Sequence, residues 1–182
     1  MGIPQDPKPA KLFIALLCSR EELFDEVEKN LAHEFGPLEL VSPVFPWEMT
    51  DFYRKEMGPK LLRKFVSHAP LVPPEDLAAI KLKTQELESR YMKVDGNRRG
   101  RQVNLDPGYL DANKVVLATT KDASHRIYLS RGIYGEVTLG YRYGSFHPQD
   151  YTYPDYRWEE TLGFFNKVRA HYMEQLKLTR SC

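Results

Sequence analysis

Residues near position 125 have side chains that could hold an anion and move a proton. His125 and Arg126 are adjacent, and Glu136 lies in the next strand-like segment. An arginine guanidinium binds phosphate or carboxylate groups through several N–H donors, and a histidine can act as a general acid or base near neutral pH. We therefore predict that Arg126 holds an anion and that His125 and Glu136 transfer protons.

The residues just before this group extend the predicted site. Thr119, Thr120 and Lys121 offer two hydroxyls and an ammonium, which suit a phosphate or carboxylate group. Asp106 is a third catalytic candidate, which could position a metal ion or act as a base. The predicted ligand is a phosphorylated small molecule, with nucleotides among the candidates.

The same residues also have a purely structural interpretation. An arginine opposite a glutamate on a neighbouring strand is commonly a solvated ion pair. A dedicated metal site is not expected, because the five histidines are scattered and form no HxH or HExxH motif. Mg²⁺ accompanying a phosphate stays compatible with the sequence, since Asp106, Asp122 or Glu136 could supply oxygen ligands.

The first half of the chain alternates strand and helix patterns. Leu12–Cys18 is a continuous apolar run typical of a buried strand. Ser19 with Glu22 predicts a capping box for the helix that follows. Leu38–Phe45 and Leu61–Val66 are the next predicted strands, and the prolines of the first favour a sheet edge.

A second helix and a fourth strand complete a unit with a known topology. Pro73-Pro74 introduces a helix whose apolar positions recur three and four residues apart up to Tyr91. A strand at Gln102–Leu105 completes the order β-α-β-β-α-β, which predicts a ferredoxin-like unit with both helices on one face of an antiparallel sheet. The basic segment Asn97–Arg101 is predicted to be a connector.

The central stretch is predicted to be an antiparallel β-meander. Asp106-Pro107-Gly108 is interpreted either as a turn or as the start of a short helix. Strands are predicted at Lys114–Thr120, His125–Leu129 and Ile133–Tyr143.

Hydrophobic alternation selects a register for the last hairpin of this meander. A three-residue loop that ends with a left-handed Gly132 places Leu129 opposite Ile133 and Arg126 opposite Glu136. The same register puts Thr119 beside Arg126. One face is then predicted to be apolar, with Ile127, Leu129, Ile133, Val137 and Leu139. The other face is predicted to carry Arg126, Tyr128, Tyr134, Glu136 and Thr138.

The chain is predicted to close with a helix whose apolar stripe runs from Trp158 to Leu176, with Asp155 as its N-cap. The predicted fold class is therefore α+β. Residues 1–10 are predicted to be a flexible tail and 11–182 a single domain. Within it, 11–105 form the ferredoxin-like part, and 106–182 form the meander and the C-terminal helix.

Composition argues against several classes of function. The net charge of +1 provides no overall attraction to nucleic acid or anionic membranes. The two cysteines, Cys18 and Cys182, do not indicate a disulfide framework or a zinc site. The apolar run at Leu12–Cys18 is too short to span a bilayer. We expect a cytoplasmic protein with reduced thiols and no membrane segment.

Two short segments suggest other partners. The basic Arg98–Arg101 loop and exposed tyrosines could make the protein a non-enzymatic adaptor for RNA or for another protein. Lys93–Arg98 matches the KxDGxR string of nucleotidyl-transferring ligases, but the further lysine and glutamate motifs of those enzymes are missing. The nucleotide-binding patterns GxxxxGK(S/T) and GxGxxG are absent. The segment from Thr119 to Asp122 lacks the spacing of the NKxD element of GTPases.

Several segments together resemble a family of small prokaryotic proteins classified as a domain of unknown function. They are FYRKEMG at 52–58, VNLDPGYL at 103–110, KVVLATTKD at 114–122, SHRIYL at 124–129, GIYGEVTL at 132–139 and TYPDYR at 152–157. The resemblance extends over nearly the whole chain. Some members of that family are labelled GTP-binding proteins, but the resemblance itself implies no reaction, ligand or catalytic residue.

Overall fold

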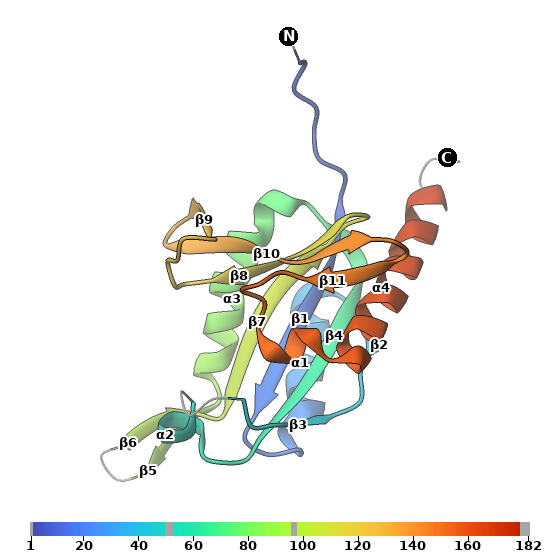
Figure 1. Cartoon of the computed structure of the whole chain (residues 1–182). Helices are drawn as coiled ribbons and strands as arrows, with labels where there is room; N and C mark the ends of the chain where they lie inside the picture. The colour runs from blue at the N-terminus through green and yellow to red at the C-terminus, as the bar shows by residue number, and fades with distance from the viewer. Residues whose placement is uncertain (1, 50–52, 96–97, 179–182) are drawn as a thin grey trace.

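Figure 1 shows the fold of the chain, a computed structural model that describes residues 2–49, 53–95 and 98–178. Its main sheet has the strand order β11-β10-β8-β7-β1-β4-β2, with β3 also paired to β4 and β9 also paired to β10. All of these pairings are antiparallel, which confirms the predicted α+β class. The strands are β1 (Ala10–Cys18), β2 (Leu38–Val41), β3 (Phe45–Trp47), β4 (Leu61–Val72), β7 (Val103–Leu110), β8 (Lys114–Thr119), β9 (Ile127–Ser130), β10 (Ile133–Arg142) and β11 (Ser145–Pro148).

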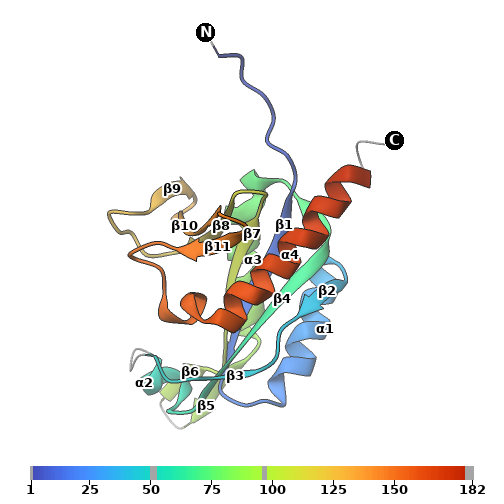
Figure 2. The same ribbon diagram turned by 45° about the vertical axis from the view of Figure 1, so that its right-hand side comes forward.

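Helices cover both faces of this sheet. In Figure 2, α4 crosses in front of β1 and β4, whereas α1 and α3 pack in the core layer that includes Leu12 and Ile14 of β1. No helix in the described ranges is long and apolar enough to cross a membrane. The helical elements are α1 (Leu23–Phe35), α2 (Arg54–Met57), the 3-10 turn η1 (Pro74–Asp76), α3 (Leu77–Ser89), the 3-10 turn η2 (Pro154–Arg157) and α4 (Glu159–Leu178).

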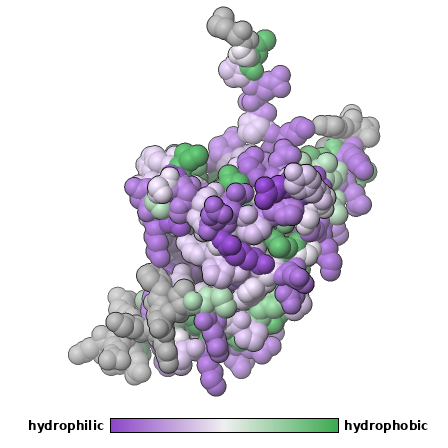
Figure 3. Space-filling view, viewed as in Figure 1, coloured by the Kyte–Doolittle hydropathy of each residue, from purple (hydrophilic) through white to green (hydrophobic). Residues whose placement is uncertain are grey.

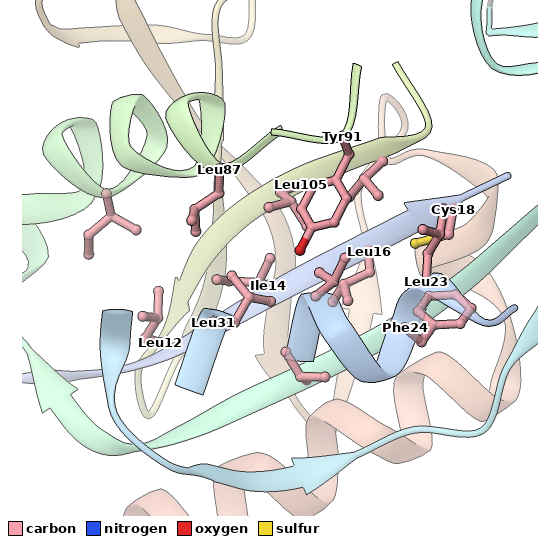
Figure 4. Packing of buried hydrophobic residues seen from close by; sticks show 14 residues of the cluster. Leu12, Ile14, Leu16, Cys18, Leu23, Phe24, Leu31, Leu87, Tyr91 and Leu105 are labelled. Carbon is pink, nitrogen blue, oxygen red and sulfur yellow. The ribbon is translucent and has the colours of Figure 1, made fainter. Parts of the chain in front are cut away.

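Strand β1 is the centre of the core because both of its faces are covered. Leu12, Ile14 and Leu16 belong to the core layer that includes side chains of α1 and α3, which Figure 4 shows. Phe13 and Ala15 point the other way, into the layer under α4. Every residue of β1 is buried, as the continuous apolar run predicted.

The start of α1 differs from the predicted capping box. The helix begins at Leu23, and its N-cap residue Glu22 makes no side-chain capping hydrogen bond. Ser19 instead continues the pairing of β1, because its N–H donates to the carbonyl oxygen of Gln102 at 3.0 Å. The end of the helix agrees with the sequence pattern, since Gly36 has a φ of 89°, which favours glycine.

Asp106-Pro107-Gly108 lies inside β7, so both predictions for this tripeptide, a turn and a helix start, are wrong. Gly108 is required there, because an added Cβ would lie 2.3 Å from the ring of Phe13 and 2.4 Å from the carbonyl oxygen of Val116. Successive residues of a strand direct their nitrogens to opposite sides, so residues two apart direct theirs to the same side. The nitrogen of Pro107 therefore points away from β1, as that of Leu105 does, and the proline removes no hydrogen bond from the β1–β7 ladder.

Strands β7 and β8 are paired at Gly108–Leu117 but not at Asp106. Beyond that pair, two side chains of α3 satisfy the edge of β7. Lys81 donates to the carbonyl oxygen of Leu105 at 2.8 Å, and Glu88 accepts the N–H of Leu105 at 2.7 Å. These contacts replace a neighbouring strand at this edge.

The predicted order of the meander is wrong. β10 lies between β8 and β9, because Tyr134 faces Thr119 on one side and Tyr128 on the other. Thr119 therefore does not lie beside Arg126 across a strand pair. A linear meander would have left β9 in the middle, whereas the structure places this short strand at the sheet edge.

The loop of the last hairpin is one residue shorter than predicted. Arg131 and Gly132 have φ values of 50° and 78°, as in a type I′ turn, and Ser130 pairs with Ile133. Between Ile133 and Tyr134 the register shifts by one residue, which compensates for the shorter loop. Further along the two strands, the register is therefore the predicted one.

The single apolar face predicted for this hairpin does not exist. Ile133 packs in the core layer that includes residues of α3, whereas Leu139 packs under α4. A second register shift, between Val137 and Leu139, reverses the alternation. Ile127 is 73% exposed, so β9 lies at the surface rather than over the core.

The basic segment predicted to be a connector forms the second strand of a hairpin. β5 (Met92–Asp95) pairs with β6 (Arg98–Arg101) in a separate two-stranded sheet. Gly96 and Asn97, which complete the KxDGxR string, lie outside the described residues, as does Cys182.

Asp155 is not the N-cap that the sequence predicted for the last helix. It lies within η2, and α4 begins only at Glu159. Its buried carboxylate oxygen Oδ2 lies 2.8 Å from Nε of Arg63 and accepts the indole N–H of Trp47 at 3.2 Å. Partners on other elements therefore replace the local cap.

Candidate functional site

Glu136 is the centre of a polar cluster on the α4 side of the sheet. Its Cα lies opposite Leu117 of β8, and its side chain is closed to solvent. Oxygen Oε2 receives two partners, Nε of Arg126 at 2.7 Å and Nε2 of His125 at 3.3 Å. The hydroxyl of Thr138 donates to the other oxygen at 3.3 Å. The structure thus brings together three residues that the sequence singled out, His125, Arg126 and Glu136.

Arg126 holds three segments of the chain together. Besides Glu136, its guanidinium donates to the carbonyl oxygen of Lys121 at 3.0 Å and to the hydroxyl of Tyr153 at 2.8 Å. Only 7% of its side chain is exposed. Three of its five N–H groups are therefore engaged, and a ligand could reach only the outer ones. The main role of Arg126 is therefore to hold these segments in place, and contact with an anion can only be an additional role.

His125 is the member of this cluster that faces solvent. About a quarter of its side chain, 26%, is exposed. Its ring stacks on that of Tyr151, with centroids 4.2 Å apart and planes at 16°. Because a carboxylate only accepts hydrogen bonds, Nε2 would have to carry a proton to bond to Glu136, whose Oε2 lies 3.3 Å away. Nδ1 of the neutral ring then keeps a lone pair that can take up a proton.

The loop between β8 and β9 carries the other predicted ligand residues. The hydroxyl of Thr119 accepts the N–H of Lys121 at 3.2 Å, so Thr119 shapes the loop. Thr120, Lys121 and Asp122 are exposed. The backbone of Lys121 is tied to Arg126, and this links the loop to the buried ion pair.

Asp106 belongs to a second polar cluster rather than to the first. Lys81 reaches its Oδ1 at 3.1 Å, and Asn104 donates to its Oδ2 at 2.7 Å. Arg63 lies further away, with Nη1 at 4.0 Å from Oδ2. Burial acts to raise the pKa of Asp106, but the charges of Lys81 and Arg63 outweigh it, so the pKa is lowered. The carboxylate is therefore held in its charged form.

Tyr153 is a further member of the cluster around Glu136. Its hydroxyl contacts Arg126. Burial raises the pKa of that hydroxyl, Arg126 acts against the rise, and the charges of Glu136 and Asp106 add to it. Both carboxylates are thus close enough to affect one phenol. Figure 3 shows that hydrophilic side chains predominate on the face where β10, β11 and η2 lie.

The residues that complete these clusters were missed by the sequence analysis. Arg63 and Lys81 lie within segments that the sequence predicted only as strand and helix, and no motif marks them. Tyr151 and Tyr153 stand in the segment TYPDYR and its neighbours, which the resemblance pointed to without assigning a role. The informative feature was a charged residue at an inward position of a strand or helix, because such a residue needs a buried partner.

The residues named for Mg²⁺ do not converge. In the described part of the chain, no group of three or more histidine, cysteine, aspartate or glutamate residues could hold a metal ion. Asp122 is exposed on its loop, and Glu136 is enclosed by Arg126 and His125. The ammonium of Lys81 on Asp106 further disfavours a divalent cation there, because like charges repel.

Comparison with known families identifies the chain. A family model described as "Domain of unknown function (DUF4416)" matches residues 8–172. The protein therefore belongs to this family, as the resemblance of its segments predicted. A search of curated proteins found no match, and neither did a search of solved structures.

Proposed function

We propose that this member of the DUF4416 family binds a phosphorylated small molecule, with nucleotides among the candidates, beside His125. The observation that carries the proposal is the arrangement on Glu136. One buried carboxylate oxygen orients both a guanidinium and an imidazole, and the imidazole stays partly open to solvent. A histidine oriented by a carboxylate is suited to accept and return a proton.

The anion would be held by groups around this histidine. Lys121 and Thr120 are exposed on the loop that leads to it, and Arg126 has outer N–H groups to offer. Tyr153 accepts a hydrogen bond from Arg126, so its own hydroxyl hydrogen is available for an anion. In this proposal, His125 transfers protons at Nδ1, and Glu136 orients its ring.

A thermal-shift screen across nucleotides and sugar phosphates, with and without Mg²⁺, tests this function. We expect at least one phosphorylated compound to raise the melting temperature, since a ligand that binds only the folded state stabilises it. Lys121→Ala and His125→Gln should reduce the shift. Lys29→Ala is the matched control, because Lys29 is an exposed lysine of α1 on the opposite face of the sheet. No shift with any phosphorylated compound would rule the function out.

A second candidate function is that of a non-enzymatic adaptor for RNA or protein, through Arg98–Arg101 and exposed tyrosines. It is favoured by Tyr143, which is 95% exposed at the tip of the β10–β11 hairpin. Arg101 is less available, since its guanidinium lies 2.7 Å from Glu56 and 2.8 Å from Glu88. RNA binding that persists without any response to phosphorylated small molecules would favour the adaptor.

We also propose that the first part of the chain is a ferredoxin-like unit within a single domain over 11–182. The support is the antiparallel order β7-β1-β4-β2, which matches a βαββαβ chain path with α1 and α3 packed in one core layer. A cytoplasmic location is proposed on the free, buried thiol of Cys18.

A further inference from the structure

Asp106 has the properties of a hydrogen-bond acceptor that is kept ready for a ligand. A carboxylate offers about four lone-pair positions, and Lys81 and Asn104 each occupy one. A quarter of the side chain, 25%, is exposed. The two neighbouring cations keep it ionised and also disfavour a metal ion. What this carboxylate can still accept is a neutral donor, such as a hydroxyl group.

Arg63 is a second sign of an incomplete polar cluster. Its side chain is 6% exposed, and its Nε is paired with Asp155 at 2.8 Å. Its Nη1 is buried and, like Nε, makes no hydrogen bond of good geometry within the described part of the chain. That nitrogen faces Asp106 from 4.0 Å, too far for a hydrogen bond. Charged donors of this kind are normally satisfied when buried.

The position of Asp106 relative to Glu136 suits one ligand that reaches both clusters. Gly108, Leu117 and Glu136 lie side by side across β7, β8 and β10. Asp106 is two residues from Gly108 along β7 and points to the same face. Strand spacing and rise place the Cα atoms of Asp106 and Glu136 roughly 12 Å apart.

We infer that Asp106 accepts hydrogen bonds from hydroxyl groups of the ligand, which makes the ligand a phosphorylated polyol, such as a sugar phosphate or the ribose phosphate of a nucleotide. This inference rests on the proposed function, because it takes the phosphate to lie beside His125 and Lys121. The phosphate end and the hydroxyl end are then recognised by separate clusters. Tyr153, whose hydroxyl accepts a hydrogen bond from Arg126, contacts the phosphate end.

The test compares ligands that differ only in hydroxyl groups. Titration calorimetry on the protein would compare adenosine 5′-monophosphate with its 2′,3′-dideoxy analogue. Ribose 5-phosphate against 2-deoxyribose 5-phosphate would form the second pair. A hydrogen bond to a charged group corresponds to about a tenfold to hundredfold difference in affinity. We expect the hydroxylated member of at least one pair to bind more tightly by about that factor.

Variants assign the difference to Asp106. Asp106→Asn should bring the two members of the pair to within about threefold of each other, since the charge-assisted bond is lost. Asp111→Asn is the matched control, because Asp111 is also paired with a lysine, Lys114, and is similarly exposed. This variant should keep the preference. If Asp106→Asn does not fold, equal binding of the two members of each pair by the unmodified protein would still overturn the inference.

The possible failures are distinguishable. Equal binding of hydroxylated and deoxy compounds would overturn the role of Asp106 and leave the phosphate site standing. A preference that survives in Asp106→Asn would also overturn it. Failure of every phosphorylated compound to bind would remove the proposed function and this inference with it.

Discussion

The Nε atom of Arg126 lies 2.7 Å from Oε2 of Glu136, whose side chain is closed to solvent, and only 7% of the Arg126 side chain is exposed. A surface pair of this kind would contribute little, whereas a buried one leaves an uncompensated charge when one partner is removed. The structural and functional interpretations of these residues are therefore not exclusive. The buried pair of Arg126 and Glu136 stabilises the local structure, and His125 is the residue of this cluster that a ligand can reach.

Replacing Arg126 should show this directly. Arg126→Met removes the partner of a buried carboxylate, and we expect the free energy of unfolding to fall by about 3–5 kcal/mol. Adding Glu136→Leu should recover most of that loss, because no charge is then left buried. Urea denaturation measures both values. A loss below about 1 kcal/mol in the single variant would contradict the burial of the pair.

The role of Asp155 can be separated from that of a helix cap. Loss of an N-cap costs about 1 kcal/mol, but loss of a partner of buried Arg63 costs about 3–5 kcal/mol. We expect Asp155→Ala to show the larger cost and to change the fluorescence of Trp47, whose indole N–H loses its acceptor. Unchanged fluorescence with a small cost would support the cap instead.

Gly108 and Gly163 make a matched pair of substitutions with opposite signs. A Cβ on Gly108 would lie 2.3 Å from Phe13 and 2.4 Å from the backbone of Val116, so Gly108→Ala should destabilise the protein by about 1–3 kcal/mol or more. Nothing lies within 4 Å of a Cβ on Gly163 in α4. Gly163→Ala should therefore stabilise by about 0.5–1 kcal/mol. Thermal unfolding of both variants tests the pair.

His68 should make the protein less stable in mild acid. Burial lowers its pKa from the ordinary 6.5, an effect that the hydrogen bond to Gly36 opposes and the charge of Lys11 reinforces. The folded state therefore keeps His68 neutral when the unfolded state is already protonated. Stability contributed by the neutral ring is fully present above about pH 6.5 and falls as the pH drops below it, by at most about 1.4 kcal/mol per pH unit.

Unfolding by urea at several values between pH 5 and pH 7 measures this dependence. In His68→Gln the dependence should be weaker than in the unmodified protein. His33→Gln serves as the control, because His33 is exposed on α1. An unchanged profile in His68→Gln would show that another group is responsible.

Segments with a regular apolar pattern were predictable from the sequence, and segments decided by distant contacts were not. β1, α3 and β8 agree closely with their patterns. Asp106-Pro107-Gly108 was misassigned because proline and glycine are locally turn formers. Here the ring of Phe13 and the backbone of β8 require a glycine within a strand. The tertiary packing of Gly108 therefore overrides the local turn preference of the tripeptide.

The contact between Arg126 and Glu136 was predicted from a loop that is wrong, and Arg126 itself lies just outside β9. A two-residue turn followed by a register shift next to Ile133 gives the same pairing beyond the shift as a three-residue loop. Alternation alone cannot distinguish the two. Nor could it show that β10 separates β8 from β9, because strand order depends on contacts between strands that the pattern of one strand does not encode.

Lys81 and Glu88 of α3 occupy the positions where a strand would otherwise hydrogen-bond to Leu105. An unpaired strand edge invites pairing with a strand of another molecule. The protection of this edge against aggregation therefore resides in a helix and not in the strand itself. Apolar substitutions at these two helical positions would uncover peptide groups in the middle of the sheet, and the solubility of the protein would depend on residues that belong to no strand.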